Sequence, residues 1–286
     1  MSDYLTTKEL ADLLRIKERK VYDLASSGDI PCVKVTGKLL FPARDVDAWI
    51  ADSRFGPLVG RSLPKVFLGS HDPLLDWALR ESRCGLATFF DGSHDGIGRF
   101  ISGEGLATGL HVRDAAGDWN IPEVARKCSD MDAVLIGFAR RRRGLVTLPG
   151  SALTSLPDLV GRTVIRRQPE SGAEPLFLQL LTEAGLDPET IHRTDAVRNE
   201  SDAALAILRG DADAAFGLEA LAVQYRLGFT PLIEESFDLL VDRRAYFDAP
   251  FQAFLDFCRS DTFLAVAARY QGYDTAPLGK VRWNAS

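Results

Sequence analysis

The stretch Lys65-Val-Phe-Leu-Gly-Ser-His-Asp-Pro-Leu-Leu-Asp-Trp-Ala-Leu79 predicts a strand, a tight turn and the start of a helix. Its apolar residues 66–68 form a short run that is typical of a strand buried on both faces. Gly69 and Ser70 interrupt this run. Asp72 can cap the following helix, and Pro73 suits its first turn. The stretch therefore predicts one βα turn of an α/β domain.

The four residues Gly-Ser-His-Asp recur at 92–95, after an apolar run at 86–90 and before a helix-like stretch. A strand that enters a helix through a small polar turn leaves backbone N–H groups free. It also places the positive end of the helix dipole at the carboxyl edge of the sheet. Such an edge can hold a small anion, although an ordinary βα turn has the same pattern. The repetition favours the anion site.

Composition bounds the protein class. The chain has 286 residues, of which 46% are hydrophobic and 26% are charged, so it can form one large domain or two. Its net charge of -6 argues against a surface that coats nucleic acid or anionic membranes as a whole. The four cysteines lack the paired spacing of a zinc ribbon or a disulfide framework. Without a secretory signal or an apolar run of ~18 residues, we expect a cytoplasmic protein with no membrane partner.

The first 54 residues predict a small domain of helices and a hairpin. The first helix begins at Thr6-Thr-Lys-Glu9, which suits a capping box, and its buried face is expected to hold Leu10, Leu13 and Leu14. A second helix is expected at about 17–26, two short strands around a Thr36-Gly37 turn within 30–41, and a third helix at 42–50.

This order of elements resembles the winged helix-turn-helix of the excisionase and MerR-like DNA-binding families. The resemblance implies that the second helix enters the major groove of double-stranded DNA and that the hairpin, or wing, touches the backbone or minor groove. The residues that carry it are Leu5-Thr-Thr-Lys-Glu-Leu-Ala11, Val21-Tyr-Asp-Leu24, Gly28-Asp-Ile-Pro31, Val33-Lys-Val35 and Phe41-Pro-Ala-Arg-Asp-Val46.

Basic side chains of the second helix and the wing are the expected DNA contacts. Cations in the first turn of a helix oppose its dipole, and phosphates would stabilise them. The alternative is a solvated basic surface. One module makes few contacts, so we expect a homo-oligomer, a dimer or higher, that reads two half-sites of an operator. Arg19 is the expected base contact, Lys17, Lys20, Lys34 and Lys38 are the expected phosphate contacts, and Tyr22 lies beside them.

Residues 55–64 predict a linker, because prolines and glycines interrupt any regular period there. The remaining residues, 65–286, alternate short apolar runs with helical stretches, which predicts α/β layers with a mainly parallel sheet. The expected strands are 66–68, 86–90, 133–138, 144–148, 163–166, 213–216 and 229–233, and the expected helices include 73–83, 121–127, 174–184 and 201–210.

Residues 65–286 are similar to the periplasmic-binding-protein-like ligand domain of cytoplasmic regulators, which is related to the molybdate and tungstate binding proteins of transporters. The resemblance implies two α/β lobes joined by crossing segments, with a ligand in the cleft between them. It rests on Gly69-Ser-His-Asp72, Gly92-Ser93, Gly109-Leu-His-Val112, Asn120, Arg142-Arg-Gly-Leu145, Pro149-Gly150, Arg167-Gln168, Ser171-Gly172, Gly210-Asp-Ala-Asp-Ala-Ala-Phe-Gly-Leu-Glu219 and Gly272-Tyr-Asp274.

That resemblance implies neutral donors for a tetrahedral oxyanion such as molybdate or tungstate. No cofactor and no catalytic residue is expected, because adjacent Ser, His and Asp cannot form a triad by themselves. The implied ligand-binding residues are the hydroxyls of Ser70 and Ser93, the backbone N–H groups of His71 and His94, and, from the second lobe, Ser171, Gly172, Ser201 in the helix start Asn199–Asp202, and Glu219.

Three features leave alternatives open. Glu170 and Glu174 stand where related domains often carry Gly-Ser-Gly-x-Arg, and a buried carboxylate there would weaken anion binding by about 1 kcal/mol or more. A transition-metal site is a second interpretation if the histidines and aspartates of the cleft converge. The run 140–143, four arginines, is expected to be a solvated crossover near the hinge, and a second DNA contact is the alternative. The residues of the metal interpretation are His71, Asp72, His94, Asp95 and His111.

Together the two resemblances predict a one-component transcriptional regulator in which ligand closes two lobes and changes how paired DNA-binding heads are presented. The alternatives are a regulator that senses a metal or a small metabolite, and a ligand-dependent protein-interaction module that does not bind DNA.

Overall fold

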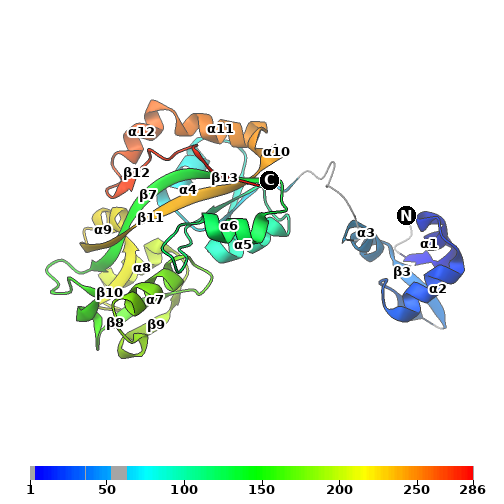
Figure 1. The fold of residues 1–286 in the computed structure, drawn as a ribbon, viewed down its shortest axis with the longest axis horizontal. Coiled ribbons are helices and arrows are strands. Elements are labelled where there is room, and N and C mark those ends of the chain that lie inside the picture. The colour runs from blue at the N-terminus through cyan, green and yellow to red at the C-terminus, as the bar shows by residue number, and fades with distance from the viewer. Residues whose placement is uncertain (1–3, 36, 53–62, 286) are drawn as a thin grey trace. The chain divides into compact units, whose positions relative to one another are not determined.

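The computed structural model describes residues 4–35, 37–52 and 63–285. The chain divides into two compact units, residues 1–61 and residues 62–286. Most of the predicted linker at 55–64 lies outside the described residues. Figure 1 shows both units.

The N-terminal unit consists of three helices and a small antiparallel sheet with the strand order β1-β3-β2. The helices, the hairpin and the capping box of Thr6 with Glu9 confirm the prediction, and β1 is an additional strand that pairs with β3. In chain order the elements are β1 Tyr4–Thr6, α1 Thr7–Leu14, α2 Glu18–Ser27, β2 Val33–Val35, β3 Lys38–Pro42 and α3 Ala43–Asp52.

One predicted core residue of this unit is wrong. The buried stripe of α1 runs through Thr7, Leu10 and Ala11, and Leu14 is half-buried, whereas Leu13 lies beside this stripe and is 53% exposed. The core of this unit is apolar, and its residues come from the helices, the sheet and the segment before the wing. Its fully buried members are Leu10, Ala11, Val21, Ile30, Phe41 and Val46.

The larger unit is built on one ten-stranded sheet with the order β5-β4-β6-β11-β7-β10-β8-β9, and β12 and β13 pair with β7. The strands are β4 Val66–Gly69, β5 Ala87–Phe90, β6 Ala107–Leu110, β7 Ala133–Thr147, β8 Thr163–Arg167, β9 His192–Val197, β10 Ala214–Leu218, β11 Gly228–Asp242, β12 Tyr273–Asp274 and β13 Val281–Asn284.

Helices cover both faces of this sheet. They are α4 Pro73–Glu81, α5 Ser93–Ile101, α6 Ile121–Cys128, α7 Ala173–Glu183, α8 Glu200–Arg209, α9 Glu219–Gln224, α10 Arg243–Tyr246, α11 Ala249–Cys258 and α12 Asp261–Ala267, with the short 3-10 helices η1 Leu156–Leu159 and η2 Pro188–Thr190.

Two long strands, β7 and β11, divide the larger unit into two lobes. They run antiparallel to each other, and both lobes are built on them (Figure 1). The first lobe holds β4, β5 and β6 with helices α4, α5, α6 and α10–α12, and the second holds β8, β9 and β10 with helices α7–α9.

Each lobe has an apolar core on both faces of the sheet. In the first lobe α4, α11 and α12 form one core, and α5 and α6 form the other. In the second lobe α7 lies over one face, and α8 and α9 lie over the other. The result is an α/β/α sandwich in each lobe, which confirms the predicted fold class.

The prediction of two strands at 133–138 and 144–148 with a solvated crossover between them is wrong. β7 is one continuous strand, because it pairs with β11 from Ala133 to Thr147. Successive side chains of a strand point to opposite faces. Arg140 and Arg142 are therefore exposed, whereas Arg141 and Arg143 are fully buried.

Four strands of the sheet were not predicted, namely β6, β9 and the short C-terminal strands β12 and β13. β6 contains only four residues, and its Gly109 is needed because a Cβ there would lie 2.8 Å from the ring of Phe237. β9 is an edge strand with mostly exposed polar side chains, so it lacks an apolar alternation. In the part of the chain that the structure describes, every helix is too short or too polar to cross a membrane.

Candidate ligand and DNA-binding sites

The two Gly-Ser-His-Asp turns meet at the carboxyl edge of the first lobe. β4 and β5 are parallel neighbours, so the turns that follow them lie side by side. Ser70 is 4% exposed and Ser93 is fully buried, and their Oγ atoms are 2.8 Å apart. The hydrogen bond between them fixes a pair of hydroxyls at the start of α5.

The hydrogen bonds of this serine pair leave donors for a third group. The N–H of His111 donates to Ser93 Oγ at 3.1 Å. Only one of the two hydroxyl protons is used between the serines, so the other is available. Among the described residues the N–H of Ser93 has no acceptor, although the residue is buried. A buried N–H without a partner is costly, and a bound oxygen would satisfy it.

Asp72 has two functions that the sequence showed only in part. One carboxylate oxygen accepts the N–H of Leu75 at 2.7 Å, which confirms the predicted cap of α4. The other oxygen lies 2.7 Å from Arg141 and accepts the hydroxyl of Tyr273. The turn that carries Ser70 is thereby attached to the strand that connects the lobes.

Six buried charged side chains lie around the two crossing strands, and we call them the arginine cluster. Each is less than one-tenth exposed, and the three arginines balance the three carboxylates. Glu235 accepts hydrogen bonds from both Arg141 and Arg143. The members are Asp72, Arg141, Glu235, Arg143, Glu200 and Arg167.

Glu200 extends the arginine cluster into the second lobe. It begins α8 and lies 3.0 Å from Arg143 Nη2 and 2.7 Å from Arg167 Nη1. Arg167 ends β8, and its Nη2 donates to the carbonyl of Arg198 at 3.0 Å. The cluster is therefore neutral as a whole and reaches from the first lobe to the second.

Buried charge sets the pKa values in the arginine cluster. Burial alone would raise the pKa of Glu235, but Arg141 and Arg143 outweigh it and hold that pKa well below the usual range. The pKa of Glu200 is lowered in the same way, against the effect of burial, by Arg143 and Arg167. Burial lowers the pKa of His111, although Glu235 lies 2.9 Å from its Nδ1.

Acid is expected to destabilise the larger unit through these two carboxylates. Their folded pKa values lie below the unfolded value of about 4.3, so their stabilisation is complete above that pH and is lost progressively as pH falls from there toward the folded pKa values. Urea denaturation of the full chain should show a falling unfolding free energy below pH about 4.3. Glu235→Gln should make this slope shallower, and an equal slope in both proteins would contradict the assignment.

The histidines and aspartates of the metal interpretation do not converge. The ring of His71 packs on Phe90, with centroids 5.8 Å apart, and its Nδ1 is buried without a hydrogen-bond partner. His94 Nδ1 lies 3.9 Å from Glu123, and Asp95 pairs with Arg99 at 2.8 Å. Within residues 4–35, 37–52 and 63–285, no three His, Cys, Asp or Glu side chains form a metal-binding group.

Ser171 and Gly172 lie against the first lobe, as the two-lobed prediction requires. Ser171 is buried, and its hydroxyl donates to the carbonyl of Gln168 at 2.7 Å and accepts the N–H of Glu174 at 3.2 Å. Its hydroxyl is therefore used inside its own turn. Gly172 packs against His111 of the first lobe, and a Cβ there would lie 2.4 Å from the His111 carbonyl oxygen.

Two of the expected ligand contacts, the N–H of His94 and the side chain of Glu219, need correction. The N–H of His94 donates to the carbonyl of Glu170 at 3.1 Å, so it already has a protein acceptor. Glu219 lies 2.7 Å from Arg142 Nε. Because Arg142 points to the opposite face of β7 from Arg141, Glu219 lies across the sheet from the arginine cluster rather than beside the serine pair.

The remaining predicted site residues of the second lobe lie at helix starts. Ser201 is half-buried in the first turn of α8, which Asn199 caps by accepting the N–H of Asp202 at 2.7 Å. Glu174 is buried, but Arg193 Nη2 lies 2.9 Å from its Oε1 and compensates its charge. The side chain of Glu170 is exposed. The unfavourable charge expected from these two glutamates is thus paired or solvated.

The predicted DNA contacts lie on α2 and the wing. All six are exposed, and Lys17 is the N-cap residue of α2. Tyr22 of α2 lines a hollow of about 820 Å³ together with Lys34 and Lys38 of the wing and Lys8 of α1. Helix α2 and the wing thus share one face, on which the cations of the hollow come from the wing and α1, whereas α2 contributes Tyr22 and the acidic Asp23. Arg19 and Lys20 are exposed on the same helix but do not line the hollow.

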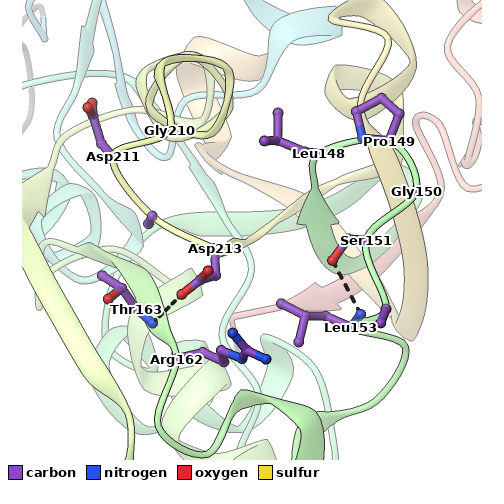
Figure 2. A pocket seen from close by; sticks show the side chains of 12 residues that line it. Leu148, Pro149, Gly150, Ser151, Leu153, Arg162, Thr163, Gly210, Asp211 and Asp213 are labelled. Atoms are coloured by element: carbon purple, nitrogen blue, oxygen red, sulfur yellow. Dashed lines mark hydrogen bonds between the residues drawn. The ribbon is translucent and has the colours of Figure 1, made fainter.

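A second hollow, of about 680 Å³, lies in the second lobe where β7 ends and β8 and β10 begin (Figure 2). Asp213 accepts the N–H of Thr163 at 2.8 Å on its wall, and Arg162 and Ser151 also line it. Ser171 and Gly172 follow the other end of β8. This hollow therefore lies at the opposite end of the strand from the serine pair.

Comparison with known proteins supports this division of the chain. Residues 77–259 match the family model described as a PBP (periplasmic-binding-protein) superfamily domain, and residues 4–54 match a helix-turn-helix domain. The uncharacterized protein YvgK of Bacillus subtilis (strain 168) is 25% identical, and the alignment covers 96% of each chain.

Solved structures share the fold of the larger unit. One is a Clostridium perfringens protein with bound phosphate, described as a candidate substrate-binding protein of a phosphate ABC transporter. It is 13% identical with a TM-score of 0.54, over 73% of this chain and 98% of that one. Another is the effector binding domain of a BenM variant, 12% identical with a TM-score of 0.50, over 73% and 97%.

Proposed function

The chain belongs to the PBP superfamily and carries a helix-turn-helix domain in front of that domain, and from this premise we propose a DNA-binding regulator that senses a small oxyanion. The helix-turn-helix supports DNA as the partner, and the PBP domain supports a small-molecule ligand. The proposal that this ligand is an oxyanion goes one step further, and the observation that supports it is the serine pair.

The serine pair offers neutral donors to an anion. One hydroxyl proton of the pair and the N–H of Ser93 remain for a ligand at the start of α5, which is the positive end of its dipole. Every arginine of the adjacent cluster is paired with a carboxylate, so a bound anion would be held by dipoles rather than by a countercharge. A protein of this fold is described with phosphate bound, which is compatible with a tetrahedral ligand.

Ligand would act on DNA affinity by favouring one arrangement of the lobes. A ligand shifts an equilibrium only as far as its affinities for the two arrangements differ. In the proposed regulator, the lobe arrangement changes how the DNA-binding units of an oligomer are presented. The operator affinity of the full chain is therefore expected to change on addition of saturating ligand, as measured by fluorescence anisotropy, and an unchanged affinity would refute the coupling.

Ser70→Ala combined with Ser93→Ala is expected to weaken oxyanion binding strongly. Hydrogen bonds to charged groups contribute about 1.5–3 kcal/mol each, so the loss should be at least about tenfold in affinity. The measurement is calorimetric titration of the full chain with molybdate and tungstate, with sulfate and phosphate as comparison anions.

The matched control is Ser82→Ala. Ser82 lies at the end of α4, and its hydroxyl donates to the carbonyl of Leu79, away from the serine pair. This variant should bind like the unmodified chain. Equal binding by the double variant would place the anion elsewhere. If none of the four anions binds, the oxyanion assignment is overturned and small organic metabolites become the class to test.

A further inference from the structure

The loop Gln168–Gly172, which joins β8 to α7 in the second lobe, reaches the first lobe at two points. The carbonyl of Glu170 accepts the N–H of His94 in the first turn of α5, at 3.1 Å. The side-chain amide of Gln168 donates to the carbonyl of Asp91 and lies 3.2 Å from its carboxylate. The second lobe thus bonds directly to the turn that carries Ser93.

Two glycines make this approach possible, one from each lobe. A Cβ at Gly92 would lie 2.3 Å from the carbonyl oxygen of Glu170, and a Cβ at Gly172 would lie 2.4 Å from the carbonyl oxygen of His111. Real Cβ atoms essentially never come that close to another heavy atom. The backbones of the two lobes are therefore in contact at two places close to Ser93. Gly92 contacts Glu170, and His111 contacts Gly172.

Gly172 differs from Gly92 in one useful respect. Gly92 has φ +124, which disfavours any side chain regardless of space. Gly172 has φ -68 and ψ -24, which any residue adopts. A side chain at 172 is thus excluded by the neighbouring lobe alone and not by the local backbone.

Two further contacts between the lobes, which we call the rim contacts, also hold α7 against the first lobe. Arg113 of the first lobe pairs with Glu183 of the second at 2.6 Å, and the side-chain amide of Gln179 donates to the carbonyl of Asp114 at 3.0 Å. Both rim contacts join α7 to the segment after β6. The loop and α7 therefore contact the first lobe as one continuous surface.

We infer that the Gln168–Gly172 loop is a clamp that sets the closed position of the lobes, and that Gly172 is its positioning residue. The Glu170 carbonyl uses a helix N-terminal donor that an anion would otherwise use. A ligand bound beside Ser93 must therefore fit under the loop or displace the carbonyl from His94. This regulatory role rests on the proposed function, whereas the clamp itself does not.

The test is amide hydrogen exchange of the full chain without added ligand, followed at His94 by NMR. Gly172→Ala is expected to raise the exchange rate of the His94 amide about tenfold or more, because the lobes must separate to admit the methyl group. The amide of Gly96 bonds to the carbonyl of Gly92 within the first lobe, so its protection should remain and report that this lobe is folded.

The matched control is Gly98→Ala. Gly98 lies on α5, and a Cβ there meets nothing within 4 Å, so exchange at His94 should not change. Gln168→Ala provides a second variant without any steric conflict, and it should raise the rate by about threefold through the lost contact to Asp91.

An unchanged His94 rate in Gly172→Ala, with Gly96 protected, would overturn the clamp. Loss of protection at both amides would show unfolding, and the Gln168→Ala result would then decide. Neither measurement uses an anion or DNA. Failure of the clamp would leave the serine-pair titration and the operator measurement intact, and failure of those would leave the clamp intact.

Discussion

Glu235→Gln is expected to lower the free energy of unfolding of the larger unit by about 3–5 kcal/mol, because it leaves two buried arginines without their shared counterion. Glu235 is fully buried and accepts hydrogen bonds from Arg141 and Arg143, and His111 lies beside it. Glutamine has almost the same shape, so the loss comes from charge rather than from a cavity.

The measurement is urea denaturation of the full chain near neutral pH. The free energy of unfolding is taken from the transition of the larger unit. Glu234→Gln is the matched control on the same strand, since Glu234 is exposed and lies 3.9 Å from the equally exposed Arg140. This control should change stability by less than about 0.5 kcal/mol. If both variants had the same small effect, the arginine cluster would not be balanced by Glu235 as the contacts indicate.

The position of the arginine cluster explains why it matters for closure as well as stability. Asp72 holds the turn of Ser70, and Glu200 holds the start of α8 in the second lobe. Both are tied through arginines to Glu235 on β11. A rotation of the lobes about β7 and β11 must therefore preserve these pairs or exchange them, because a lone buried charge costs several kcal/mol.

Local sequence signals predicted the turns and helices of this protein well. The capping box of α1, the Asp72 cap of α4 and the Asn199 start of α8 all depend on residues within four positions of each other, and all are present. The neighbouring Gly-Ser-His-Asp turns were predictable for the same reason, because parallel βα units bring successive carboxyl edges together.

The arginine cluster could not be predicted in the same way. The partners of Arg143 lie 57 and 92 residues away, so no short window contains the ion pairs. Four consecutive arginines also resemble a solvated patch. The available signal was their position inside a strand of alternating faces, which requires two of the four side chains to be buried once both ends of the strand are in the core.

The contacts between the lobes were likewise beyond a sequence pattern. Glu170 and Glu174 suggested an unfavourable charge in the cleft, yet Glu170 contributes its carbonyl and Glu174 pairs with Arg193. The type of a residue in the sequence does not show whether its side chain or its backbone makes the contact between the lobes. The glycine at 172 was the better indicator, since a helix start in ordinary conformation has no local need for it.

In the N-terminal unit, Arg19→Ala is expected to reduce discrimination among DNA sequences. Arg19 is exposed on α2, the helix that the helix-turn-helix match implies for the major groove. A bidentate contact of arginine with guanine contributes about 1–3 kcal/mol, so affinity for the preferred sequence should fall by about 5- to 150-fold. Binding to unrelated DNA should fall much less, because phosphate contacts remain.

The experiment first selects preferred duplexes from a randomised pool with the full chain and then measures binding of each variant at several salt concentrations. Lys38→Ala, in the wing, should instead weaken binding to all sequences and reduce the salt slope by about 1. Arg44→Ala on α3 is the arginine control, because it lies outside both α2 and the wing. If Arg19→Ala and Lys38→Ala both bound like the unmodified chain, this face would not be the DNA-binding surface. If Arg19→Ala altered only the salt slope, Arg19 would contact phosphate, and base recognition would belong to another residue of α2.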